Sequence, residues 1–235
     1  MQHVSLSLQL AFGLISLATV YWFYVASNKS KIFLLIAFLW MSFQMILGLT
    51  EFYLDGLSLP PRFLLLLLPP ILLAIAMFTT KKGKIFIETL DLKQLTLIQT
   101  IRAGLEIILF DLYLAKAVPE IMTFEGRNFD IISGLTAPVV YYYGFIKKSM
   151  NRTAMITWNV ISLALALNIV FTAILSAQTP FQQFGFEQPN IAVAYFPFNW
   201  LPSVVVPILL FSQLISIRQL IMAKKEGFDK SRIQH

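Results

Sequence analysis

The side chains best able to do chemistry lie inside one strongly apolar stretch of the sequence. Gln99, Glu106, Tyr113 and Glu120 recur every seven residues, and Arg102 precedes Glu106 by four. In a helix this spacing places them on one face, where Arg102 and Glu106 can form an ion pair. Placing a charged group at the centre of a membrane helix costs about 2.5–3.5 kcal/mol of insertion free energy, so such a group is expected to have a structural or functional role. One interpretation is a buried pair that fixes helix packing, with Gln99 satisfying spare donors. The other is a substrate, ion or proton site.

A second group of polar side chains gathers near one end of the apolar stretches and in the loops that join them. Together with the intramembrane pair, it predicts these ligand-binding residues: Glu51, Arg62, Arg102, Glu106, Glu120, Glu125, Arg127, Asn128, Asp130 and Asn199. We expect those near the ends to line an outward-facing polar vestibule. Because acids outnumber arginines there, the expected ligand is a small cationic or hydroxyl-rich molecule.

The residue types exclude several kinds of catalytic centre. The chain has no cysteine, so it has no thiolate nucleophile and no Cys-zinc site. Its two histidines, His3 and His235, sit at opposite ends of the sequence, which argues against a His-ligated metal. We therefore predict no metal, no cofactor and no catalytic residue.

The composition indicates that a lipid bilayer surrounds the chain. Of its 235 residues, 57% are hydrophobic and 13% are charged, against about 25% charged in a soluble domain. Stretches of about 20 apolar residues are long enough to cross the hydrocarbon as helices. The predicted fold is all-α, a single domain over 1–235 with seven transmembrane helices, at about 6–27, 32–53, 62–80, 94–118, 130–146, 155–177 and 196–222.

Basic residues set the orientation of these segments. Fourteen of the 18 Lys and Arg residues follow the first, third and fifth segments or lie at the end of the seventh segment and after it. The positive-inside rule then places the N-terminus outside and the C-terminus in the cytoplasm. Such short basic loops favour membrane lipid headgroups as partners rather than nucleic acid. Within the longest basic loop, residues 85–92 could form a short helix at the membrane surface.

Three short strings resemble those of a family of uncharacterised bacterial integral membrane proteins. They read PPRF at 60–63, TFEGRNFD at 123–130 and QPNIAV at 188–193. The resemblance implies seven helices and a multi-pass protein of the bacterial inner membrane, and it carries no activity. Retinal proteins fit poorly, because the segment 196–222 holds no lysine for a retinal Schiff base.

The sequence favours a small-solute transporter or a ligand-binding membrane protein, and a non-enzymatic role. Transport is suggested by the prolines within the helices, since broken helices often line binding sites; such prolines are also common in membrane helices generally. One alternative is an intramembrane enzyme acting on a lipid or lipid-linked substrate, with Glu125 and Asp130 as acid and base and Arg127 holding a phosphate. Another is a non-catalytic receptor or a subunit of a membrane assembly. A homo-oligomer is a further option, because seven helices without a repeat are few for a transporter.

Overall fold

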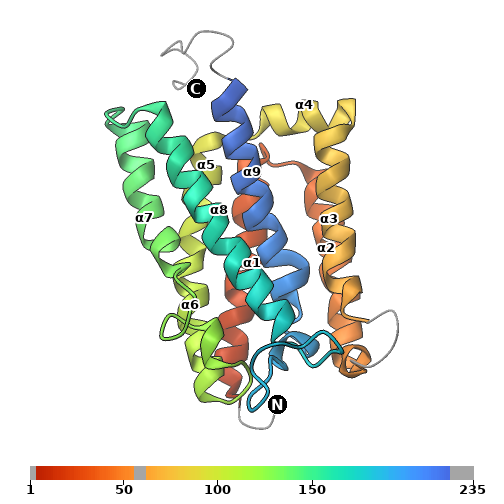
Figure 1. The fold of residues 1–235 in the computed structure, drawn as a ribbon. Coiled ribbons are helices and arrows are strands. Elements are labelled where there is room, and N and C mark those ends of the chain that lie inside the picture. Colours follow the sequence, from red (N-terminus) through yellow and green to blue (C-terminus); the bar gives the residue numbers. More distant parts are fainter. Residues whose placement is uncertain (1–3, 56–61, 223–235) are drawn as a thin grey trace.

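The structure is a computed structural model that describes residues 4–55 and 62–222, and this part of the chain is built from helices with no β-strand (Figure 1). The α-helices are α1 (Leu6–Ala26), α2 (Lys31–Leu49), α3 (Leu64–Thr79), α4 (Lys81–Thr89), α5 (Leu92–Leu97), α6 (Ile101–Leu114), α7 (Ile131–Tyr141), α8 (Arg152–Leu175) and α9 (Val206–Met222). Short 3₁₀ turns are η1 (Phe52–Leu54), η2 (Ile98–Thr100), η3 (Glu120–Met122) and η5 (Ala192–Ala194), and π-helical turns are η4 (Tyr142–Ile146) and η6 (Leu201–Val205). His3, the Pro60-Pro61 pair, and the basic tail with His235 lie outside the described residues.

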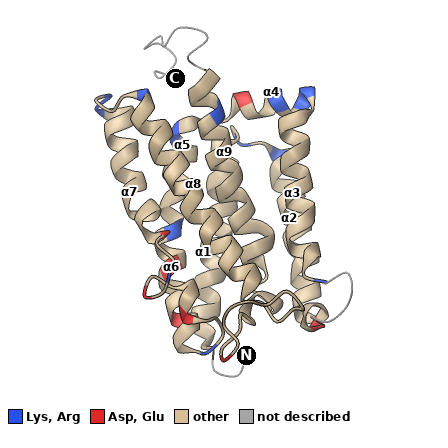
Figure 2. Ribbon diagram, in the orientation of Figure 1, with Lys and Arg blue, Asp and Glu red and all other residues tan. Residues whose placement is uncertain are grey.

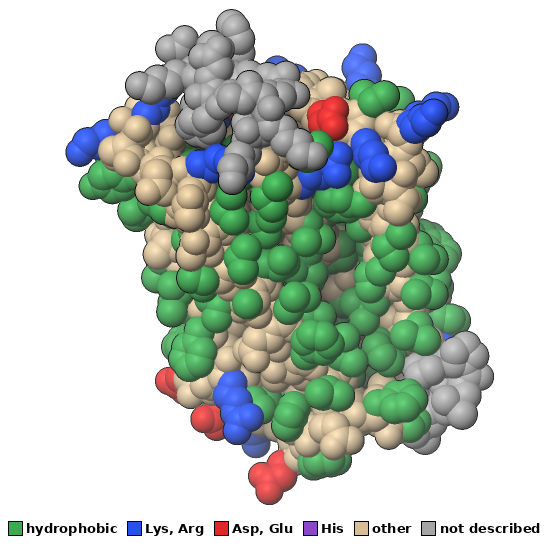
Figure 3. Space-filling model, turned by 45° about the horizontal axis from the view of Figure 1, so that its top comes forward, with side chains coloured by type: hydrophobic (Ala, Val, Ile, Leu, Met, Phe, Trp, Pro, Cys, Tyr) green, Lys and Arg blue, Asp and Glu red, His purple; other side chains and the backbone are tan. Residues whose placement is uncertain are grey.

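Several helices have the length and composition of membrane spans. Four qualify on their own: Leu6–Ala26, Lys31–Leu49, Arg152–Leu175 and Leu201–Met222. A fifth qualifies if α3 and α4, which are bent by 91°, count as one span. Their outer faces carry large apolar side chains: Leu14 on α1 is 67% exposed and Phe38 on α2 is 66% exposed. Figure 3 shows hydrophobic side chains covering the middle of the face in view, as expected where lipid surrounds a helical membrane protein.

The predicted segment 94–118 is a run of three consecutive elements. α5, η2 and α6 follow one another without a gap from Leu92 to Leu114. The predicted segment 130–146 is likewise α7 followed directly by η4. Prolines accompany the irregular turns, with Pro138 inside α7 and Pro202 inside η6, because a proline removes a helix hydrogen bond. α3, by contrast, continues through both Pro69 and Pro70.

The short helix predicted in the basic loop is present, but it begins four residues earlier, at Lys81. It lies almost at a right angle to α3. The turn is tight because Gly83 approaches the backbone of Met77 so closely that a Cβ atom would have no room. Lys81, Lys82 and Lys84 are exposed. Figure 2 shows Lys and Arg gathered at the end of the molecule that carries α4, and Asp and Glu mostly at the opposite end.

α1 lies in the middle of the bundle and contacts α2, α5, α6, α9 and η6. Its inner face carries Phe12 and Phe23, which are 1% and 2% exposed. Phe12 packs against Phe198, with ring centroids 5.1 Å apart. The buried hydroxyls of Ser16 and Thr19 donate to carbonyls one turn earlier, so they need no partner from another helix. One face of α1 therefore packs into the core, while its other face is exposed.

Candidate functional site

The site forms because α7 begins deep inside the bundle. α7 and η4 together cover 16 residues from Ile131 to Ile146, or about 24 Å, which is shorter than the roughly 30 Å of hydrocarbon. Gly134 of α7 lies directly against the backbone of Ala103 at the start of α6. The loop between the two helices therefore returns along α6, and Phe124 stacks on Phe110 with ring centroids 4.8 Å apart.

Arg102 is the centre of the buried polar cluster, and its side chain is 1% exposed. Its Nη1 atom donates to Asp130 Oδ1 at 2.8 Å and to the Ser162 carbonyl at 3.0 Å. Its Nη2 atom donates to Gln213 Oε1 at 2.5 Å. One guanidinium thus joins α6, the start of α7, α8 and α9. Charged hydrogen bonds of this kind are the strong ones, particularly where water is excluded.

Glu106 lies one turn along α6 from Arg102 and is 2% exposed. Asn128 Nδ2 donates to its Oε1 atom at 2.6 Å, and Asn128 Oδ1 accepts the backbone N–H of Asp130 at 3.1 Å. Within the described ranges, Glu106 Oε2 is buried and has no hydrogen-bond partner. A buried acceptor without a partner is costly, so this oxygen marks the place where a ligand could bind.

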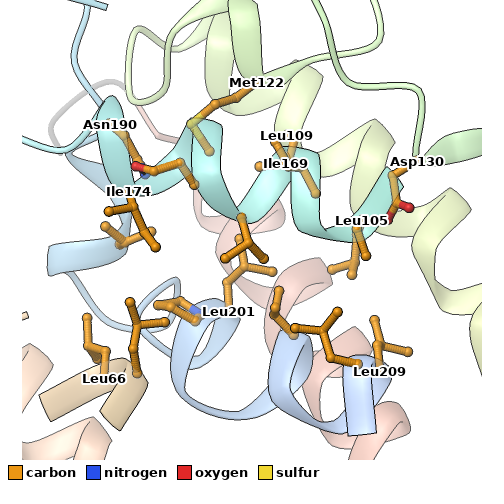
Figure 4. Close-up of a pocket in the computed structure, with 18 of the residues that line it drawn as sticks. Leu66, Leu105, Leu109, Met122, Asp130, Ile169, Ile174, Asn190, Leu201 and Leu209 are labelled. Atoms are coloured by element: carbon orange, nitrogen blue, oxygen red, sulfur yellow. Dashed lines mark hydrogen bonds between the residues drawn. The ribbon is translucent and has the colours of Figure 1, made fainter. Parts of the chain in front are cut away.

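Glu106 faces a cavity of about 90 Å³ between α3, α6, α8, η6 and α9. Its walls are apolar and mostly aliphatic apart from four side chains, Arg102, Glu106, Asp130 and Asn190. Figure 4 shows Asp130 and Asn190 at opposite sides of the cavity, with the aliphatic side chains, Ile169 among them, between the two. Asn190 is 3% exposed, and its Oδ1 atom also has no partner in the described part of the chain. The cavity is therefore apolar along its length and polar at two sides.

The structure brings together four of the predicted ligand-binding residues: Arg102, Glu106, Asn128 and Asp130. The prediction of an Arg102–Glu106 ion pair is wrong, because the guanidinium turns to Asp130. Gln99 does not serve the guanidinium either, since its Nε2 atom donates to the carbonyls of Leu95 and Leu209.

The other predicted residues lie elsewhere. Glu51, Glu120, Glu125 and Arg127 are exposed. Glu125 and Arg127 thus lie at the surface, whereas Asp130 is buried.

Arg62 and Asn199 also lie outside the cluster. Arg62 pairs with Asp55 at 2.8 Å, and its guanidinium lies over the Phe52 ring. Asn199 is buried in a separate contact, where its Nδ2 atom donates to the Gln44 carbonyl at 2.5 Å. These two residues stabilise the attachment of neighbouring segments.

Sequence reasoning missed the parts of the site that come from distant segments. The contact at Ser162 is made by a backbone carbonyl, which the residue type does not reveal. Gln213 is an amide within an apolar span, and Asn190 lies in one of the polar loop strings, so both were visible as polar residues but not as members of this site. Over the described ranges, no group of three or more His, Asp or Glu side chains is placed to hold a metal ion.

The sequence pattern of a domain of unknown function, DUF8737, matches residues 59–221. The chain belongs to the DUF8737 family. The matched region contains the Arg102 cluster and every residue that lines the cavity, whereas α1 and α2 precede it. Membership of DUF8737 agrees with the resemblance to a family without a known activity. No curated protein and no solved structure matches the chain.

Proposed function

We propose that the chain is a multi-pass protein of the bacterial inner membrane with seven membrane-crossing segments, its N-terminus outside and its C-terminus in the cytoplasm. The segments would be α1, α2, α3, the run α5–α6, α8, η6 with α9, and the run α7–η4 completed by the loop that leads into it, since irregular backbone is tolerated at membrane depth where protein covers it. Figure 1 supports this, because the shorter segments run alongside the four long ones. The basic end seen in Figure 2 supports the orientation, since short basic loops stay in the cytoplasm.

We further propose that the protein binds a small amphiphilic ligand in the cavity between α3, α6, α8 and α9. One observation carries this proposal: an aliphatic cavity meets a buried carboxylate whose second oxygen has no partner among the described residues. Binding sites for small molecules are typically apolar with a few fixed polar groups. An alkyl chain would contact the aliphatic wall, and a polar head group would reach Glu106. The proposed ligand is therefore partly apolar, which refines the expectation of a cationic or hydroxyl-rich solute.

The position of the polar groups supports binding inside the bundle rather than in an open outer vestibule. Arg102, Glu106 and Asp130 are each less than 10% exposed. Three hydrogen bonds from different segments hold Arg102 in place. A site whose charged groups are fixed in this way is preorganised for its ligand.

Filling the cavity tests the proposal. Ala166 of α8 lines it, whereas Ala164 lies on the exposed face of the same helix. We expect the parent protein, purified in a mild detergent, to retain an amphiphilic small molecule that native mass spectrometry detects. Ala166→Phe should lose this molecule and Ala164→Phe should keep it, and thermal unfolding reports whether each variant is folded.

Two outcomes would overturn the proposal. One is a parent protein that retains no amphiphile. The other is a folded Ala166→Phe variant that retains as much as Ala164→Phe. If Ala166→Phe does not fold, Ala173→Leu fills the same cavity from about two turns further along α8 and takes its place.

A further inference from the structure

The charges around the cavity are unequal. Two carboxylates, Glu106 and Asp130, line it together with one guanidinium, Arg102. Arg102 donates hydrogen bonds to Asp130, to the Ser162 carbonyl and to Gln213. The one hydrogen-bond partner of the Glu106 carboxyl in the described chain is the neutral amide of Asn128. Glu106 therefore shares one cation, Arg102, with Asp130 and forms no ion pair of its own, which is costly for a buried carboxylate.

The unpartnered atoms in the cavity indicate which kind of head group a ligand must have. Glu106 Oε2 and Asn190 Oδ1 are hydrogen-bond acceptors, both line the cavity, and neither has a partner in residues 4–55 or 62–222. A head group that satisfies Glu106 Oε2 must donate a hydrogen bond, and Asn190 Oδ1 lies too far across the cavity for the same head group to reach it. A carboxylate or phosphate head group cannot donate, and it would add a third negative charge beside Glu106 and Asp130.

Two head groups remain, an ammonium and a hydroxyl. A hydroxyl could donate to Glu106 and also accept from Arg102 Nε, which has no partner in the described chain either. It would leave the charge of Glu106 uncompensated. An ammonium donates three hydrogen bonds and also supplies the positive charge. Charge balance therefore favours the ammonium.

We propose that the cavity takes an amphiphilic primary amine, whose ammonium donates to Glu106 Oε2 and whose alkyl chain lies along the aliphatic wall towards Asn190. This inference rests on the proposed function, since it names the head group of the ligand bound there. The ammonium can belong to a short soluble alkylamine or to a long-chain lipid amine that carries no phosphate, and the recognition chemistry at Glu106 is the same.

Three ligands with one alkyl chain separate the head groups. Hexylamine, hexanol and hexanoate share their chain and differ in charge at pH 7. Binding of each to the purified parent protein is measured by isothermal titration calorimetry in detergent. We expect hexylamine to bind at least about tenfold more tightly than hexanol, because its ammonium adds the attraction of opposite charges to the hydrogen bond with Glu106, and hexanoate to bind most weakly.

A neutral replacement of the Glu106 carboxylate tests whether this group recognises the positive charge of the ligand. Glu106→Gln keeps the shape and the hydrogen bond from Asn128, and it should weaken hexylamine binding by at least about tenfold while leaving hexanol binding nearly unchanged. Glu120→Gln is the matched control, because Glu120 is exposed and outside the cavity; it should bind hexylamine as the parent does. Displacement of hexylamine by sphingosine, a long-chain amine without a phosphate, would identify a lipid source of the ammonium, and its failure a soluble one.

The outcomes separate this inference from the proposed function. Equal or tighter binding of hexanol or hexanoate to the parent overturns the ammonium and leaves an amphiphile site in place, and this comparison needs no variant. Unchanged hexylamine binding by folded Glu106→Gln also overturns the role of Glu106. If none of the three ligands binds although the parent retains an amphiphile, the head group is wrong and the proposed function stands. If none binds and no amphiphile is retained, both fail.

Discussion

Arg102 and Asp130 are 28 residues apart in the sequence, and their side chains form an ion pair at 2.8 Å in the interior. The pair joins the start of α6 to the start of α7. It exists because the loop between these helices returns into the bundle instead of remaining at its end. The same return brings Asn128 to Glu106. One feature of the backbone thus assembles the side of the cavity that holds Glu106 and Asp130.

Removing one partner of this pair should be strongly destabilising. Arg102→Leu leaves Asp130 buried without its cation, a change that costs about 3–5 kcal/mol in buried pairs. The double variant Arg102→Leu, Asp130→Leu removes both charges and should lose less stability than the sum of the two single variants. Unfolding of the detergent-solubilised protein in a denaturant titration measures these differences. Strictly additive losses would show that the two side chains are not coupled.

The ion pair between Arg62 and Asp55 provides the matched control. Its side chains are 39% and 42% exposed, and exposed pairs contribute at most about 1 kcal/mol. Arg62→Ala should therefore change the free energy of unfolding far less than Arg102→Leu does. Similar losses for both variants would contradict the assignment of Arg102 as the buried centre of the site.

Much of the helical architecture could be predicted because it depends on local properties of the chain. Apolar runs of about 20 residues set the helices, and the ends of α1, α2 and α9 fall within a few residues of their expected positions on at least one side. The return of the loop before Asp130 could not be predicted in this way. It depends on Gly134 fitting against Ala103, which is a contact between segments and leaves no periodic signal in either.

In the candidate site, too, the features that depend on local sequence could be predicted and those that depend on contacts between segments could not. Helical spacing correctly placed Arg102 and Glu106 on the inner side of one segment. It then suggested that they pair, because four-residue spacing is the local route to an ion pair. The structure satisfies Arg102 from three other segments instead. The presence of charged residues deep within an apolar segment predicted that Arg102 and Glu106 belong to a site. Packing between helices decides which partner each of them has.

The close approach of α7 to α6 predicts a sharp contrast between two glycines. At Gly134 an added Cβ would meet the Ala103 Cα and Cβ atoms at 2.9 Å, whereas at Gly13 of α1 nothing lies within 4 Å. Gly134→Ala should lower the free energy of unfolding by about 1–3 kcal/mol, because overpacking forces the helices apart. Gly13→Ala should be neutral or should stabilise by up to about 1 kcal/mol. Thermal unfolding of the two variants tests this, and a harmless Gly134→Ala would contradict the close crossing.

The proposed orientation can be tested directly, because the parent sequence has no cysteine. Lys82 of α4 and Glu125 of the loop before α7 are both exposed and lie on opposite sides of the membrane in the proposed topology. A membrane-impermeant maleimide should label Glu125→Cys in spheroplasts, and Lys82→Cys only after the membrane is permeabilised. The parent should remain unlabelled under both conditions. Labelling of Lys82→Cys in intact spheroplasts would reverse the orientation.

The attachment of η1 to α2 depends on a buried hydrogen bond. The Tyr53 hydroxyl donates to Gln44 Oε1 at 2.6 Å, and the two residues are 5% and 0% exposed. Tyr53→Phe removes the donor and leaves a buried amide oxygen without it, so we expect a loss of about 1–2 kcal/mol in the free energy of unfolding. Tyr113 makes the corresponding bond to Glu120 at 3.3 Å in an exposed position, where water can replace the lost donor. Tyr113→Phe should therefore cost less than about 0.5 kcal/mol. Denaturant titration of both variants under the same conditions measures the contrast, and equal losses would show that burial does not set the strength of the Tyr53 bond.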